Sequence, residues 1–155
     1  MSTWDNFDGL KVKFGLDRAE ENPKGKNAVQ ATKHMTVSID IVNGNHALTD
    51  VSEWDAAIPA GSFIKSADLV VTEAFVGGTS VTIGLAETDQ TIIDADGIDA
   101  AVATAALAAN KAVVCDGALV GGTDGVGSAA AVVYVTTAGT YTAGKADLVI
   151  EYVEV

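Results

Sequence analysis

The chain of 155 residues is long enough for one domain with its own hydrophobic core. Its 21 acidic and 9 basic residues give a formal net charge of −12, which argues against a nucleic-acid partner because phosphate binding needs Lys and Arg. A single cysteine excludes an intrachain disulfide. The sequence opens without the pattern of a signal peptide and has no apolar run of about 18 residues, so we expect synthesis in a cytoplasm and no membrane partner.

Charge is divided unevenly along the chain. Residues 1–33 hold six basic and five acidic groups, whereas residues 34–155 hold three basic and sixteen acidic groups. Residues 1–30 are rich in polar residues and turn formers, with one weakly alternating stretch, Lys11–Leu16, that predicts a short strand. We therefore expect residues 1–30 to form an extended N-terminal arm and residues 31–155 to form a single domain.

Aromatic residues in this arm need a surface to pack against. Trp4, Phe7 and Phe14 all lie in the polar N-terminal stretch. A chain end seldom exposes its aromatic side chains to water unless they dock elsewhere. The docking surface is either the chain's own domain or a neighbouring subunit or partner, and the sequence leaves both possibilities open.

Alternating apolar residues predict β-strands after the arm. Residues 31–42 alternate cleanly, which is typical of a half-buried strand. Residues 67–75 and 80–85 are predicted to form a hairpin around Gly77 and Gly78, because paired glycines readily adopt the positive φ of a tight turn. The remaining predicted strands are residues 112–116, 129–137, 139–143 and 145–155, the last with Leu148, Ile150 and Tyr152 on one face.

One Ala-rich segment predicts a short helix over residues 98–110. Ile98, Val102 and Leu107 would form its buried stripe, and Asp96 would cap its first turn. The short, evenly spaced strands indicate a mainly β protein. We expect a jelly-roll-like antiparallel β-sandwich that carries this one short helix and the extended N-terminal arm.

Three aspartates form the sharpest local motif. Asp94, Asp96 and Asp99 offer oxygen atoms of the kind that bind calcium. Their spacing departs from an EF-hand loop, which needs a third acidic residue before the glycine and a bidentate Glu after it. Capping of the predicted helix explains the three residues, since Asp94 and Asp99 would lie near its positive end. They are kept only as weak metal candidates, and no cofactor is expected.

Other reactive residues lack the partners that chemistry requires. His34 and His46 have no second ligand at metal-binding spacing. Cys115 lies in an apolar stretch beside Asp116 and without a nearby base, which predicts a buried, unreactive thiol. The glycine-rich residues 121–128 lack the Lys and Ser/Thr of a phosphate-binding loop. No carboxylate pair is singled out for glycoside hydrolysis, so we expect the chain not to be an enzyme.

Several segments nevertheless resemble one family, and together they cover roughly residues 55–155. They are similar to head decoration (cement) proteins of tailed bacteriophages, which are small β-sandwich virion proteins. The resemblance rests on turn and strand patterns and not on a catalytic signature. The segments are Ile58–Gly61 (IPAG), Phe75–Gly84 (FVGGTSVTIG), Asp94–Ala101 (DADGIDAA) and Thr140–Tyr152 (TYTAGKADLVIEY).

This resemblance implies a structural function. Decoration proteins stabilise a phage capsid by binding between subunits of the major capsid protein, often as homotrimers, on the outer surface of the virion. An extended arm suits such a protein because it can clamp neighbouring subunits. The candidates for contact with the capsid are therefore aromatic and basic arm residues, namely Trp4, Phe7, Lys11, Lys13, Phe14 and Arg18.

Three alternatives stay open. The first is a carbohydrate- or cell-surface-binding β-sandwich module, with calcium at Asp94 and Asp96, a face of aromatic residues, or a glycan-binding loop at residues 117–128. The second is another virion part, such as a head-fibre or tail component. The third is an esterase or glycosidase, for which the isolated Cys and His residues supply no catalytic grouping.

Overall fold

The computed structural model describes residues 2–5, 11–14, 32–43 and 57–154. The chain divides into two units, Met1–Ala31 and Thr32–Val155, and each unit is described by itself.

The first unit contains two paired strands. Strand β1 (Ser2–Asp5) runs antiparallel to β2 (Lys11–Phe14). The strand expected at Lys11–Leu16 is therefore present over Lys11–Phe14.

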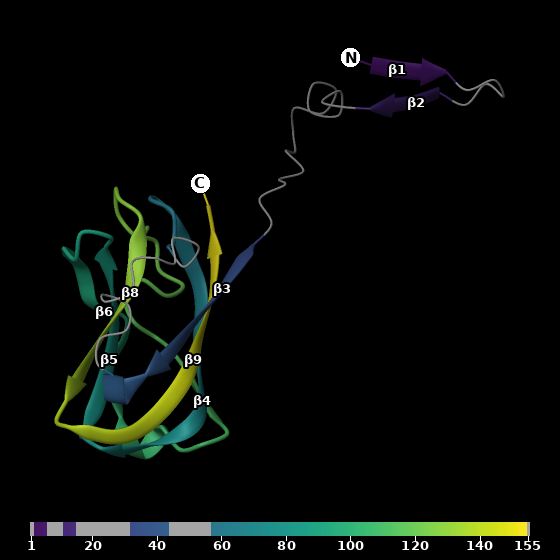
Figure 1. Cartoon of the computed structure of the whole chain (residues 1–155). Coiled ribbons are helices and arrows are strands. Elements are labelled where there is room, and N and C mark those ends of the chain that lie inside the picture. Colours follow the sequence, from purple (N-terminus) through teal and green to yellow (C-terminus); the bar gives the residue numbers. More distant parts are fainter. Residues whose placement is uncertain (1, 6–10, 15–31, 44–56, 155) are drawn as a thin grey trace. The chain divides into compact units, whose positions relative to one another are not determined.

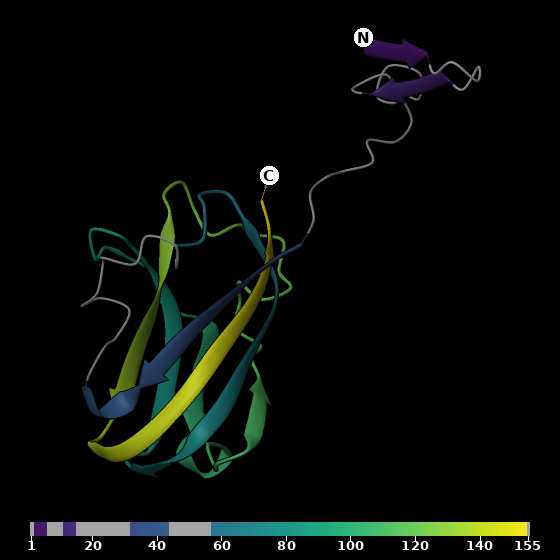
Figure 2. The ribbon, with the colours of Figure 1, turned by 45° about the vertical axis from the view of Figure 1, so that its right-hand side comes forward.

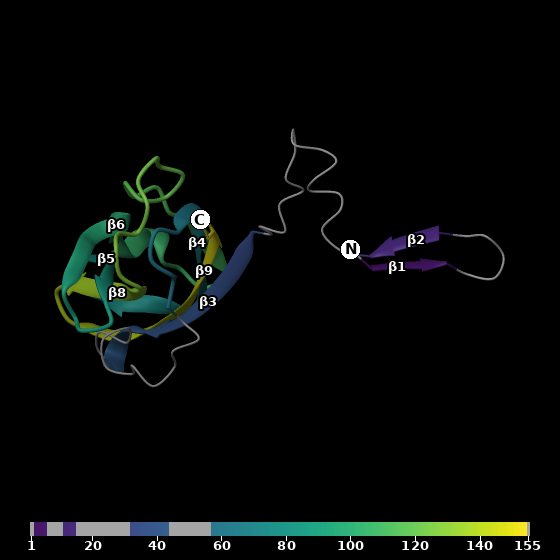
Figure 3. The same cartoon turned by 90° about the horizontal axis from the view of Figure 1, so that it is seen from above.

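The second unit consists of two antiparallel sheets (Figure 1). Viewed from above, β6, β5 and β8 lie along one side of this unit and β4, β9 and β3 along the other (Figure 3). The four-stranded sheet has the order β3 (Lys33–Asp40), β9 (Tyr141–Val153), β4 (Phe63–Gly77), β7 (Lys111–Val114). The three-stranded sheet has the order β6 (Ile92–Ala103), β5 (Ser80–Glu87), β8 (Ala131–Ala138). Two 3-10 turns, η1 (Ile41–Asn43) and η3 (Thr104–Ala106), follow β3 and β6.

The core is built from alternating residues of both sheets, as the period-two geometry of strands requires. Leu148 and Ile150 of β9 are fully buried beside Leu69 of β4, and they face Ile83 and Leu85 of β5. This arrangement confirms the mainly β, antiparallel sandwich expected from the sequence. The seven strands in the described residues of the second unit do not by themselves define a jelly roll, which therefore stays a prediction.

Strand β9 lies in the middle of the four-stranded sheet, with β3 on one side and β4 on the other. Figure 2 shows β3 and β9 side by side along the length of the sandwich, and their register is regular from Lys33 opposite Tyr152 to Asp40 opposite Lys145. The sequence predicted two short strands in place of β9. A single strand passes through this point because Gly144 adopts a φ of 145° and leaves room for the Phe75 ring, which would lie 2.7 Å from a Cβ atom there.

The predicted hairpin of residues 67–75 and 80–85 is wrong, because β4 belongs to the four-stranded sheet and β5 to the three-stranded sheet, and the two strands do not pair. Gly77 and Gly78 instead form the bend at which the chain passes from one sheet to the other, and their φ values of 93° and 52° are ones that glycine adopts readily. Gly78 also packs against the ring of Tyr141, so a Cβ atom at this position would lie 2.2 Å from the ring. The two glycines therefore allow both the bend between β4 and β5 and the close packing of the Tyr141 ring against Gly78.

The predicted helix over residues 98–110 is wrong. Residues 98–103 belong to β6, and only Thr104–Ala106 form a helical turn, of the 3-10 type. Ala residues favour a helix only weakly, and tertiary pairing overrides that preference. Here Val102 pairs with Val81 of β5, and the segment gains ladder hydrogen bonds and burial that an isolated helix would lack.

Within the described residues, no helix is both long and apolar enough to span a lipid bilayer.

Candidate functional site

The predicted capsid-contact residues lie in the N-terminal unit. Trp4 belongs to β1, and Lys11, Lys13 and Phe14 belong to β2. In the ladder, the pairs Ser2–Phe14 and Trp4–Val12 alternate with Thr3–Lys13 and Asp5–Lys11. Residues paired across a ladder share a face, so the aromatic positions fall on one face and the lysine positions on the other. The two remaining candidates, Phe7 and Arg18, lie outside the described residues.

A second candidate surface is the outer face of the four-stranded sheet. It carries alternate residues whose neighbours along each strand are buried. Acidic side chains from β4 and β9 dominate the middle of this face. Residues 34–155 hold three basic and sixteen acidic groups, a net charge of −13, so an acidic surface is expected. We define this outer face by Ser38, Ser66, Asp68, Val70, Val114, Asp147 and Glu151.

Hydroxyl groups orient the carboxylates of this outer face. Ser38 Oγ on β3 donates to Asp147 Oδ1 on β9 at 2.7 Å, and Ser66 Oγ on β4 donates to Glu151 Oε2 at 3.2 Å. Both bonds cross between adjacent strands and involve residues in register. The acidic groups are thus held in place without being neutralised.

Two valines interrupt the acidic surface. Val70 of β4 is 39% exposed and Val114 of β7 is 73% exposed. Asp68 pairs with Val114 and Val70 pairs with Ala112, so the apolar and acidic positions are neighbours. The outer face therefore combines negative charge with a small apolar strip.

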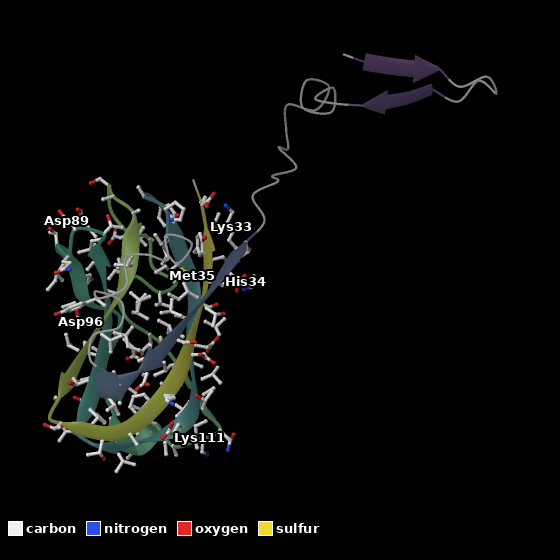
Figure 4. All side chains as sticks on the ribbon, viewed as in Figure 1. Lys33, His34, Met35, Asp89, Asp96 and Lys111 are labelled. Carbon is white, nitrogen blue, oxygen red and sulfur yellow. The ribbon has the colours of Figure 1, made fainter. Side chains whose placement is uncertain are left out.

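The three candidate metal ligands do not converge. Asp94 and Asp96 lie in a bulge of β6, where Asp94 Oδ1 accepts a hydrogen bond from the Asp96 backbone N–H at 3.3 Å. Figure 4 shows Asp96 on the outside of the sandwich, whereas Asp99 is only 7% exposed. The described residues contain no group of three His, Cys, Asp or Glu side chains that could hold a metal ion. The expected helix cap at Asp96 is also wrong, because β6 replaces the helix.

A close approach of the backbone explains this bulge. Between the pairs Ile83–Asp99 and Leu85–Asp94, β6 carries three more residues than β5. The extra residues cross over Gly84, where a Cβ atom would lie 2.1 Å from the Asp94 carbonyl oxygen. The DADG motif is therefore a bulge that only glycine at position 84 accommodates.

The thiol of Cys115 is buried, as the sequence predicted, with 2% exposure. Burial, and then the charge of Asp99, raises the pKa of Cys115 to about 12. The sequence pointed to Asp116 as the acidic neighbour, but the structure brings in Asp99 from β6 as well. This proximity could not be found from spacing, because Asp99 belongs to β6 of the three-stranded sheet and Cys115 directly follows β7 of the four-stranded sheet.

The remaining candidates have structural positions. His34 is exposed on β3, as Figure 4 shows, next to the buried Met35, and His46 lies outside the described residues. The glycine-rich loop is tied to the start of β4. Gly121 N–H donates to the Ile64 carbonyl at 2.9 Å, and Val126 N–H donates to the Ser62 carbonyl at 2.9 Å. The loop is therefore attached to the four-stranded sheet by backbone hydrogen bonds at the start of β4.

Comparisons with known proteins give a shared fold. No protein-family profile matches the chain, and no curated protein sequence matches it. Its antiparallel β-sandwich is similar to a chain of a solved structure, the cyanophage Pam1 capsid asymmetric unit. The TM-score is 0.51 at 12% sequence identity, over 84% of this chain and 94% of that chain. At this identity, the similarity shows that the two chains share a fold.

Proposed function

We propose that the chain is a structural, non-enzymatic virion protein that decorates a tailed-phage capsid. In this proposal it lies on the outer surface, binds between subunits of the major capsid protein and acts as a homotrimer. The observation that supports the proposal most is the sandwich shared with a chain of a phage capsid asymmetric unit, because the similarity spans 94% of that chain.

The charge distribution is compatible with this function. The outer face of the four-stranded sheet is acidic, so it would favour a partner surface of basic charge. The N-terminal unit carries its lysine and aromatic positions on opposite faces of the β1–β2 ladder. A two-stranded ladder is marginally stable alone in water, and the aromatic face would therefore gain from packing on a capsid subunit.

Stabilisation in this proposal comes from added interface area. Each copy contributes a modest interface, and many copies arranged symmetrically oppose the outward pressure of the packaged genome together.

The direct test is co-sedimentation of the full-length chain with purified empty heads of the phage that encodes it. We expect binding by the wild type, and loss of binding when Lys11→Glu and Lys13→Glu are combined with Trp4→Ser. The matched control combines Lys65→Glu and Lys111→Glu, two exposed lysines of the sandwich unit, and should bind like the wild type. Absence of wild-type binding would refute the decoration role. Equal binding by all three proteins would refute the assignment of Trp4, Lys11 and Lys13 as contact residues but would leave the decoration role intact.

Light scattering after gel filtration tests the assembly state. We expect a trimer whose mass is the same in calcium and in EDTA. A monomer that unfolds in EDTA would instead favour the calcium-dependent binding module. The structure gives that alternative little support, because the three aspartates do not converge, and the described aromatic side chains of the sandwich are all buried or half-buried.

A further inference from the structure

A short segment after β7 joins the two sheets at the bulge of β6. Gly117 N–H donates to the Ile98 carbonyl at 2.8 Å, and Leu119 N–H donates to the Gly97 carbonyl at 2.9 Å. We call these four residues the bulge seam. Because β7 belongs to the four-stranded sheet and β6 to the three-stranded sheet, the bulge seam connects the two layers of the sandwich along this edge.

The bulge seam is tightly packed. A Cβ atom on Gly117 would lie 2.4 Å from the Gly97 carbonyl oxygen, and one on Gly97 would lie 2.6 Å from Leu119 Cδ1. Backbones this close leave little room to adjust if a neighbouring group changes its charge.

A buried carboxyl group lies next to the bulge seam. Asp99 follows Ile98 directly and is 7% exposed. The thiol of Cys115, which is 2% exposed, donates to the Val113 carbonyl at 4.0 Å, and the charge of Asp99 acts on the pKa of this thiol. The further charged groups that act on this pair are Asp116, whose charge acts on Asp99, and Asp68 of the outer face, whose charge acts on Cys115. Both are acidic, so an Asp99 carboxylate gains no opposite charge from them.

We propose that the bulge seam is a pH-sensitive joint, which holds the two sheets together while Asp99 is protonated and loosens when Asp99 ionises. An ionised Asp99 would be a buried charge beside Asp116, which disfavours the closed seam. Local opening to water relieves both costs. This inference does not depend on the proposed function.

The direction of the effect follows from linkage. Burial, and then the charge of Asp116, raises the pKa of Asp99 above its usual value. The stabilising contribution of Asp99 is thus fully present below its unfolded pKa of about 3.9 and is lost as pH rises through the folded pKa. The joint is therefore most stable in acid, and it weakens as the pH rises and Asp99 ionises.

Native-state hydrogen exchange of the full chain, followed by NMR from about pH 3, below the unfolded pKa of Asp99, to pH 8, tests the proposal. The reporters are the Gly117 and Leu119 amides, after correction for intrinsic exchange. The internal reference is the Gly121 amide, which donates to Ile64 in the four-stranded sheet. We expect the reporters to lose at least about threefold in protection relative to Gly121 as the pH rises. A constant ratio would overturn the proposal.

Three variants locate the responsible group. Asp99→Asn should make the ratio independent of pH, and Asp94→Asn, a change in the same bulge, should leave it as in the wild type. Asp116→Asn removes the facing negative charge from an exposed position, so the loss of protection should move to lower pH. A pH dependence that persists in Asp99→Asn would overturn the proposal. If that variant fails to fold, an unshifted transition in Asp116→Asn would do so.

Discussion

The hydroxyl groups of Thr104 and Tyr141 lie 2.7 Å apart and are hydrogen-bonded, which joins the turn η3 to the first residue of β9. The Tyr141 ring meets Phe75 edge to face, with ring centroids 5.8 Å apart and planes at 83°. This geometry is favourable for aromatic pairs. A polar and an apolar contact thus meet in one side chain, at the end of the sandwich where the chain passes from β4 to β5.

Removal of the Tyr141 hydroxyl should lower stability modestly. Tyr141→Phe keeps the ring contact and deletes the bond to Thr104, so we expect the free energy of unfolding to fall by about 1 kcal/mol. Urea denaturation measures the change, and Tyr134→Phe on the half-exposed face of β8 serves as the control. Thr104→Val in the Tyr141→Phe background should cost little more. Additive losses would contradict a shared hydrogen bond.

Gly84→Ala should disrupt the bulge of β6. The added methyl group would overlap the Asp94 carbonyl oxygen and the Ala95 backbone. We expect a loss of about 2–3 kcal/mol in the free energy of unfolding, because backbone atoms must move to accommodate it. Gly61→Ala is the matched comparison. Its φ is 73°, but no atom lies within 4 Å of the added methyl group, so only backbone strain of about 1 kcal/mol applies. Equal losses in the two variants would argue against the close approach at Gly84.

Ser62→Ala should stabilise the protein. Ser62 is fully buried, and its Oγ has no hydrogen-bond partner among the described residues. Burial of an unsatisfied hydroxyl costs about 1–3 kcal/mol, so its removal should raise the free energy of unfolding by about 1 kcal/mol. Ser66→Ala is the control, because it removes the bond to Glu151 and should be neutral or slightly destabilising. A loss of stability in Ser62→Ala would reveal a partner for the hydroxyl, such as a buried water molecule.

The thiol of Cys115 should resist modification in the native protein. Its pKa is raised from 9.0 to about 12, first by burial and then by the charge of Asp99. At pH 8 the thiolate fraction is therefore about a thousandfold lower than for a thiol with pKa 9. An aromatic disulfide reagent should label the folded protein far more slowly than the chain in guanidinium chloride. Labelling at comparable rates would contradict the buried position.

Ionisation of Cys115 should also weaken the fold in strong alkali. Because the pKa is raised by folding, the stabilising contribution of the neutral thiol is complete below pH 9 and is lost as pH rises toward 12. Denaturation of the wild type and of Cys115→Ala at pH 7 and pH 10.5 measures this contribution. The wild type should lose more stability than the variant over this interval, and parallel losses would argue against it.

The part of the fold that depends on local pattern could be predicted from the sequence. Leu148, Ile150 and Tyr152 alternate with polar residues, and all three are buried on one face of β9. Gly77 and Gly78 indicated a bend with positive φ, although the hairpin predicted around them is wrong because β4 and β5 belong to different sheets. In both cases, neighbouring residues in the chain determine the conformation.

The region around β6 could not be predicted in this way. Residues 98–103 form a strand because β5 offers a pairing partner, and the bulge exists because Gly84 leaves space for it. Neither condition is visible within the segment. The juxtaposition of Asp99 and Cys115 likewise depends on two sheets that pack together. The apolar strip of Val70 and Val114 could have been expected from strand alternation, but its position beside Asp68 required the register of β4 and β7.

The position of β9 has a consequence for how the protein is made. This strand follows all other described strands in the chain, yet β3 and β4 meet only through it. A ribosome must therefore complete Val153 before the four-stranded sheet can close, and until then the edges of β3 and β4 stay open to other chains. A chain that ended before β9 would leave these strand edges unpaired, so only chains that extend through β9 can close the four-stranded sheet.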